Sequence, residues 1–333
     1  MIIMDTISIK MISWEKGVNS RLEFNITGVN NTIVNCIRRI GLSDIPIYSF
    51  NDIKITDNTS IFNNNYMKLR LCNLPVLGIA SDDPIYIKKE PILLKKLDIE
   101  EEDEIDMSTN ENINSSTLKQ LTMYLDVTNT TNEIITVGTD QCNFYYMEKQ
   151  IESPYKTIYN NIPIIKLQPK QKIKLSAITR LGIESESSIF SPVSVFGFKQ
   201  NDENDYNIYL ESRGQLDEKT ILHYVYLNLV NMLDKFIILI PSNTSINGKI
   251  VLDNTDHTLG TLIAYGLQNH KKVKFAGYNM PHLLNNMIQF HYELYEENDI
   301  KDILTDVISK IKKMYKTIDV MIDEKIIYKE SKK

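Results

Sequence analysis

The chain has 333 residues, of which 42% are hydrophobic and 9% aromatic, so it can build the cores of two or three modules. Its formal net charge is −6 at pH 7. Proteins that hold nucleic acid alone usually carry a basic stripe, so this balance favours protein partners and only local or indirect contact with nucleic acid. The composition also excludes a largely disordered chain.

The cysteines predict neither a zinc site nor a disulfide framework. Cys36, Cys72 and Cys142 are scattered and lack C-x-x-C spacing. Free thiols fit a reducing compartment, and the longest apolar run, 236–241, is far too short to cross a membrane. No charged n-region and apolar h-region opens the chain. We expect an intracellular, soluble protein without a metal ion or cofactor.

The N-terminal part predicts two strands followed by a capped helix. Residues 5–28 alternate apolar and polar side chains, as strands do. Asn30 or Asn31 can cap a helix from Thr32 to about Leu42. The apolar positions of that helix follow the i, i+3, i+4, i+7 pattern of an amphipathic helix: Ile33, Cys36, Ile37 and Ile40. Extended segments and a short helix near residue 70 follow.

The middle of the chain has a different character. Residues 98–116 are acidic and then polar, which predicts an exposed loop; the alternative is an acidic docking tail for a basic partner. From 121 to 200 alternating and apolar runs predict strands. We therefore expect a β-rich insert over 81–200.

The C-terminal part returns to helices and strands. A strand over 206–212 and a helix over 218–234 precede a polar connector over 241–248. Asp256 then caps a second amphipathic helix, and a long helix starts at Asp299. Their predicted apolar faces include Leu259, Leu262, Ile263, Leu267, Val307 and Ile311.

One unit of this chain occurs twice. Residues 32–37 (TIVNCI) match 258–263 (TLGTLI) at a constant offset (258 − 32 = 226), and strand-like alternation precedes both. The repetition predicts an α+β fold with two units, each an antiparallel sheet with helices, that form an intramolecular pseudo-dimer. The first unit would comprise 1–80 and 201–240, and the second 241–333. Burial of the two apolar helix faces would join them, at about 1.5–3 kcal/mol per large side chain.

Two side-chain groups outside the predicted core could carry function. Arg38 and Arg39 lie off the apolar stripe and can bind carboxylates in bidentate fashion; a plain solvated face is the alternative. Asp256 and His257 permit a catalytic interpretation, but no nucleophile motif accompanies them, so a helix cap is the simpler one. The histidines match no common metal-ligand spacing.

Several segments resemble the alpha-like subunits of multisubunit RNA polymerases. Residues 31–46 (NTIVNCIRRIGLSDIP), 69–75 (LRLCNLP), 165–173 (IKLQPKQKI) and 210–214 (LESRG) are similar to the third-largest subunit. Residues 256–262 (DHTLGTL) and 275–282 (FAGYNMPH) are similar to its small alpha-like partner. One chain with both sets looks like the fused form found in large DNA viruses.

The resemblance implies a non-catalytic assembly platform without cofactor. Its partners would be the two largest polymerase subunits and small polymerase subunits, with DNA bound only through the complex, no membrane contact and no homodimer. Asn35, Arg38 and Arg39 fall on the family's N-x-x-R-R motif, which implies docking of a large subunit. The structural motif of the second unit would be Asp256, His257, Thr258, Gly260, Gly277, Tyr278 and Pro281.

The sequence also departs from the family. The metal-binding loop of relatives falls at the acidic segment 98–116, so no metal is expected there. The insert's G-x-x-H-A-K segment is replaced from Gly182 onward, which puts a contact made there in doubt. If viral, the protein would lie in the host cytoplasm and be packaged in the virion. Two other hypotheses stay open: a small-molecule enzyme with a cleft at Asp256 and His257, and a stand-alone dimerisation scaffold.

Overall fold

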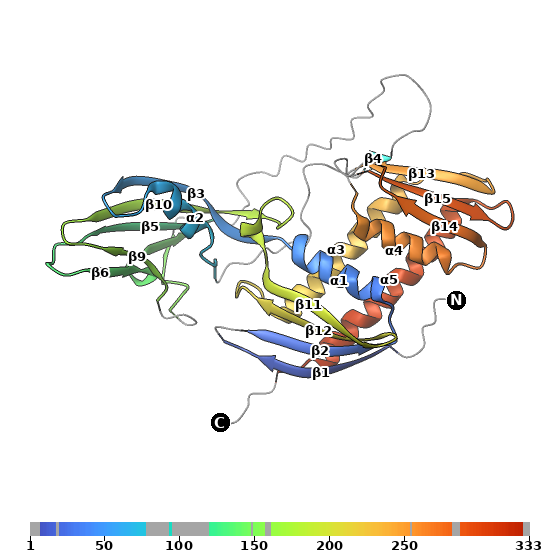
Figure 1. Cartoon of the computed structure of the whole chain (residues 1–333), viewed down its shortest axis with the longest axis horizontal. Helices are drawn as coiled ribbons and strands as arrows, with labels where there is room; N and C mark the ends of the chain where they lie inside the picture. The colour runs from blue at the N-terminus through green and yellow to red at the C-terminus, as the bar shows by residue number, and fades with distance from the viewer. Residues whose placement is uncertain are drawn as a thin grey trace, which may run out of the picture.

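Antiparallel sheets and helices build the whole described structure, in agreement with the predicted α+β class. The computed structural model describes residues 7–17, 20–77, 93–94, 120–147, 149–156, 161–253, 255–281 and 287–328. The acidic segment 98–116 and His282 lie outside the described residues. Figure 1 shows two sheets on either side of a group of helices, with a third, separate β-rich part at the left.

The first sheet combines strands from two distant parts of the chain. Its order is β1-β2-β12-β11, and every neighbouring pair is antiparallel. Helix α1 follows β2, and helix α3 follows β12. The bounds are β1 Ser8–Glu15, β2 Arg21–Thr27, β11 Val193–Asp202, β12 Asp205–Ser212, α1 Asn31–Ser43 and α3 Glu218–Leu239.

The second sheet has the order β14-β15-β13-β4. The short β4 pairs with the end of β13. Helix α4 follows β13, and helix α5 follows β15. The bounds are β4 Leu93–Leu94, β13 Asn247–Asp253, β14 Val273–Asn279, β15 Ile288–Leu294, α4 His257–Gln268 and α5 Ile300–Lys325.

The repeated unit of the sequence is also a repeated structure. Strand β2 ends at Thr27 and β13 at Asp253, and the N-caps of the next helices are Asn30 and Asp256. Both spacings equal the sequence offset (253 − 27 = 256 − 30 = 226). In both copies the cap side chain accepts a hydrogen bond from the second following amide, from Thr32 N and Thr258 N.

The four long helices share one core. In Figure 1 these helices lie between the first and second sheets, and their buried side chains form a single cluster with those of the two sheets. Helices α3 and α5 also contact the sheet of the other half. Helix α5 packs on β1, and Phe236 of α3 meets Phe290 of β15 with ring centroids 6.0 Å apart. Helix α3 is long and apolar enough to cross a membrane, but its buried residues line this core: Ile221, Leu222, Val225, Leu229, Leu233 and Phe236.

The insert has a core of its own. Its larger sheet has the order β3-β10-β5-β7-β8, and a two-stranded sheet, β6-β9, contributes to the same core. Helix α2 buries Met67 and Leu71 there. The bounds are β3 Ile47–Asn58, α2 Asn64–Cys72, β5 Leu121–Thr128, β6 Ile135–Gly138, β7 Asn143–Tyr146, β8 Lys149–Ile151, β9 Pro163–Leu167 and β10 Lys172–Gly182, with short 3₁₀ turns at Thr139–Gln141 and Ser188–Phe190.

The insert is larger at its start and shorter at its end than the expected 81–200. Strand β3 pairs with β10 over its whole length, from Ile47 opposite Gly182 to Asn58 opposite Ile173, and so belongs to the insert. Strand β11 instead pairs with β12 in the first sheet. The β3–β10 pairing joins segments more than a hundred residues apart, and β11 enters the first sheet through β12, which pairs with the distant β2; local alternation reveals neither pairing. Helix α3 also continues beyond the predicted end, since Phe236 is buried.

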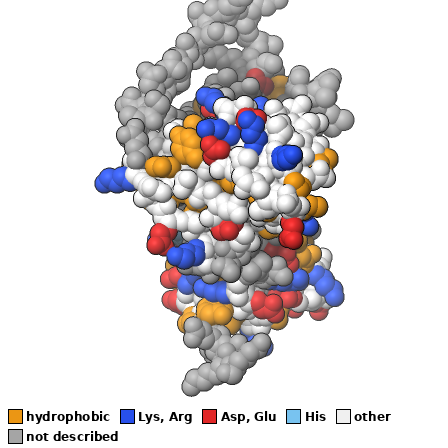
Figure 2. Space-filling model, turned by 90° about the vertical axis from the view of Figure 1, so that its left-hand side faces the viewer, with side chains coloured by type: hydrophobic (Ala, Val, Ile, Leu, Met, Phe, Trp, Pro, Cys, Tyr) orange, Lys and Arg blue, Asp and Glu red, His pale blue; other side chains and the backbone are white. Residues whose placement is uncertain are grey.

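The surface at the insert end carries both signs of charge. Figure 2 shows Lys and Arg side chains beside Asp and Glu, with hydrophobic side chains between them. Cross-strand ion pairs on the insert's sheet, such as Lys174 with Asp126 at 2.8 Å, mix the signs further. This face therefore lacks the single-sign basic field of a nucleic-acid groove.

Replacement of Phe236 tests the shared core. Phe236→Ala should lower the free energy of unfolding by about 3–5 kcal/mol, because it leaves a cavity against the other half. The matched control is Ile238→Ala on the same helix, where the side chain is 76% exposed and the loss should be below about 0.5 kcal/mol. Urea unfolding measures both; equal losses would contradict the shared core.

Candidate interface between the two halves

The predicted apolar faces meet in one interface. Helix α1 contacts α4 and α3, and α4 contacts α5. All predicted interface residues are buried in the shared core, each at most 4% exposed: Ile33, Cys36, Ile37, Ile40, Leu259, Leu262, Ile263, Leu267, Val307 and Ile311. A void of only about 10 Å³ lies among α1, α3 and α4, so the interface has the close packing of a protein interior.

Arg39 ties α1 directly to the start of α4. Its Nε donates to Thr258 Oγ1 at 2.7 Å, and its Nη2 donates to Asp256 Oδ2 at 3.2 Å. The resemblance implies a docking role for Arg39 on an outer face; this contact within the chain was not predicted. One signal was available: Arg39 comes three residues after the interface residue Cys36, so it borders the same stripe.

The carboxylate that caps α4 is the one that Arg39 binds. Asp256 Oδ1 accepts from Thr258 N at 2.9 Å, and Oδ2 accepts from Thr258 Oγ1 at 2.9 Å. The side chains of Arg39 and Asp256 are 38% and 49% exposed, so the ion pair by itself is worth about 0–1 kcal/mol. The contact instead helps to align the two halves, because it connects the helix cap of one half to a side chain of the other.

The neighbouring arginine has a different environment. Arg38 donates from Nε and Nη2 to Asn35 Oδ1, at 3.1 and 2.9 Å, within its own helix. Both side chains are half-buried at the surface of α1. The amide holds the guanidinium on the helix without neutralising its charge.

The DHTLG motif packs against the strand that carries the GY pair. The Tyr278 hydroxyl lies 3.2 Å from His257 Nδ1 and 2.7 Å from Thr261 Oγ1. The Tyr278 ring covers Gly260, where an added Cβ would lie 2.8 Å from two ring atoms. Only glycine leaves room for this ring. Pro281 lies exposed just after the strand.

The second copy has no catalytic arrangement of Asp256 and His257. The carboxylate faces Thr258 and Arg39, whereas the imidazole faces Tyr278. Across the described residues, no three His, Cys, Asp or Glu side chains group as metal ligands would.

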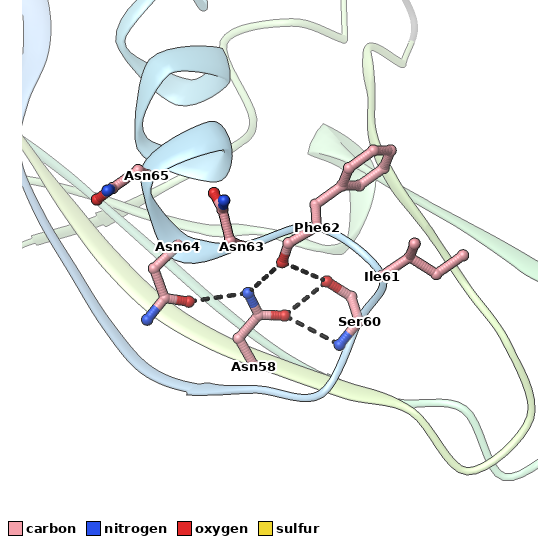
Figure 3. Close-up of a pocket in the computed structure, with 7 residues that line it drawn as sticks. All are labelled: Asn58, Ser60, Ile61, Phe62, Asn63, Asn64 and Asn65. Carbon is pink, nitrogen blue, oxygen red and sulfur yellow. Dashed lines mark hydrogen bonds between the residues drawn. The ribbon is translucent and has the colours of Figure 1, made fainter.

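A shallow hollow lies elsewhere, in the turn between β3 and α2 (Figure 3). Its volume is about 520 Å³, and Asn58 organises it by bonds to Ser60, Phe62 O and Asn64. Its lining residues carry no titratable group, so it offers no acid or base: Asn58, Ser60, Ile61, Phe62, Asn63, Asn64 and Asn65.

A buried polar contact joins α5 to α1. The Tyr315 hydroxyl donates to the Ile33 carbonyl at 3.2 Å and lies beside the Cys36 thiol. Burial raises the pKa of Cys36 to about 12, so this thiol stays protonated at neutral pH. Cys36 is therefore an interface residue and not a reactive nucleophile.

Ion pairs border the seam between α3 and α5. Lys219 Nζ meets Asp323 Oδ1 at 2.6 Å, and His223 Nδ1 lies 3.1 Å from both Asp319 oxygens. Nearer the other end, Asp234 of α3 pairs with Lys312. Along the chain both helices carry a positive side chain first and a negative one later, so the observed antiparallel packing brings opposite charges together, whereas a parallel packing would oppose like charges.

Comparison with known proteins fits this two-part architecture. The family model of the RNA polymerase Rpb3/Rpb11 dimerisation domain matches residues 247–320, which run from β13 into α5. An RNA polymerase subunit of Acanthamoeba polyphaga mimivirus is 26% identical over 96% of this chain and 94% of its own length. Over nearly its whole length the chain is thus similar to a viral RNA polymerase subunit, and its C-terminal part matches the Rpb3/Rpb11 dimerisation domain.

Archaeal and eukaryotic polymerase subunits match shorter stretches of the chain. Rpo3 of Methanosphaera stadtmanae is 25% identical over 54% of the chain and 57% of its own length. The polymerase II subunit RPB11 of Schizosaccharomyces pombe is 33% identical over 17% of the chain and 46% of its own length. These relatives are subunits of DNA-directed RNA polymerases.

The two motif glycines of the Rpb11-like part should differ in tolerance. Gly260→Ala should lower the free energy of unfolding by about 1–3 kcal/mol, because the added methyl overlaps the Tyr278 ring. Gly277→Ala is the matched control, since its Cβ would meet only Phe275, at 3.4 Å. Thermal unfolding compares them, and an equally stable Gly260→Ala variant would contradict the packing argument.

Proposed function

We propose that this chain is the assembly platform of a DNA-directed RNA polymerase. Its two alpha-like halves pair within one polypeptide as a pseudo-dimer, and the paired unit docks the two largest subunits. The observation that carries the proposal is the shared helical core, because it gives one rigid body with surfaces from both halves. Small polymerase subunits would complete the assembly, and DNA would be reached only through it.

The docking face proposed for a large subunit is the exposed side of α1. Asn35 holds the Arg38 guanidinium in place, and two of its five N–H donors are used in that contact. The remaining donors have no partner among the described residues, so they can bind a carboxylate of a partner. Arg39 borders the same face, and its contact with Asp256 holds α4 beside it.

The insert would provide a second docking site for a partner subunit. Its core is separate from the shared helical core, so it can contact a partner without disturbing the pairing of the halves. The polymerase relatives make an intracellular location the natural one, and in a virus the complex would work in the host cytoplasm and be packaged in the virion. A pair formed within one chain needs no homodimer.

Charge reversal at Arg38 tests the docking face. Arg38→Glu should reduce co-purification of the two largest subunits at least tenfold, because it places a carboxylate against the carboxylate of the partner. The thermal midpoint of the isolated chain should stay unchanged, since Arg38 contacts only Asn35 in its own helix. Lys313→Glu on the exposed side of α5 is the control with an equal charge change. Normal recovery of both large subunits with Arg38→Glu would remove the docking claim.

A further inference from the structure

The two halves present matched positions that differ in chemistry. The offset of 226 residues makes Asn30 equivalent to Asp256, Cys36 to Leu262 and Arg39 to Tyr265 (256 − 30 = 262 − 36 = 265 − 39 = 226). All of these positions lie on the caps or interface sides of α1 and α4. An interface between two such units therefore has two equivalent sides, and the side chains on them can be compared directly.

The contact of Arg39 with Asp256, here called the polar clamp, exists on one side of the interface only. Arg39 of α1 meets the capping carboxylate Asp256 of α4. The equivalent positions on the other side hold Tyr265 and the neutral cap Asn30. A pair of two first halves would thus place two arginines near neutral caps, and a pair of two second halves would leave two carboxylates without an arginine.

The buried contact next to the clamp is one-sided as well. The small Cys36 lies beside the large Tyr315 of α5, and both are at most 3% exposed. At the equivalent position, Leu262 borders the same small void as Cys36, together with the α3 side chains Leu229, Met232 and Leu233, none of which has a hydroxyl. A second Tyr315 against the larger Leu262 would be overpacked.

We propose that these two contacts make each half selective for the other half and unfavourable for a copy of itself. Arg39 with Asp256 supplies the charge match, and Cys36 with Tyr315 supplies the size match. The covalent connector then raises the effective concentration of each half near the other, while the two contacts make the mixed pair the favoured one. This inference concerns pairing inside the chain and does not rest on the docking of the large subunits.

A double-mutant cycle on the intact chain tests the charge match. Arg39→Tyr and Asp256→Asn each install the residue found at the equivalent position, and asparagine keeps the helix cap of α4. We expect the two substitutions to be coupled by about threefold in the unfolding equilibrium constant. Arg38→Tyr with Asp256→Asn is the control cycle and should show additivity. Additive behaviour of the Arg39 cycle would overturn the charge match.

Selectivity itself is measured on a chain cut after folding. A protease site in the exposed connector between Ile240 and Asn247 yields two fragments, which are mixed in mild denaturant, returned to buffer and weighed by native mass spectrometry. The wild type should give only mixed pairs of one first and one second fragment. The variant Cys36→Leu/Arg39→Tyr, and Arg39→Tyr alone, should give pairs of two first fragments in addition.

Two results would overturn the proposal. One is a wild type that forms like pairs in the statistical share, about half of all pairs. The other is a set of variants that stays as selective as the wild type. Loss of large-subunit binding with unchanged selectivity would instead remove only the proposed docking function, so the two failures are distinguishable.

Discussion

The mutual burial of α1, α3, α4 and α5 is the interaction on which the rest of the structure depends. Each half provides one sheet and two helices, and the apolar faces of those helices are covered by the other half. The contacts of α5 with β1 and of Phe236 with Phe290 show that a helix of each half also packs on the sheet of the other half. A single half would expose these faces to water, at a cost of about 1.5–3 kcal/mol for each large side chain. We therefore expect neither half to be stable without the other.

The cap of α4 shows how local and long-range structure are linked. Asp256 satisfies the first amides of its own helix and also binds Arg39 from the other half. Removal of its carboxylate would affect both helix formation and the contact between halves. Arg38, one residue away from Arg39, takes no part in this link and stays on the surface with Asn35. Of these two adjacent residues, Arg39 thus contacts the other half, whereas Arg38 contacts only its own helix.

The sequence predicted the repeated strand–turn–helix unit and its buried stripe because both depend on local periodicity and caps. Ile33, Cys36, Leu259 and Leu262 could be assigned to the core from spacing alone. The limits of the insert could not, since β3 is assigned by its distant partner β10, and the β11–β12 hairpin is assigned by the pairing of β12 with the distant β2. The role of Arg39 also depended on which residue of the other half lies opposite, and no helical period contains that information.

Hydrogen exchange of backbone amides in the native chain tests the shared core most directly. If the two halves are one cooperative unit, the most protected amides of α1, α3, α4 and α5 will exchange with the same free energy of opening and respond equally to urea. The insert, with its separate core, is free to open at a different value. Opening of α4 and α5 at a clearly lower free energy than α1 and α3 would contradict the account.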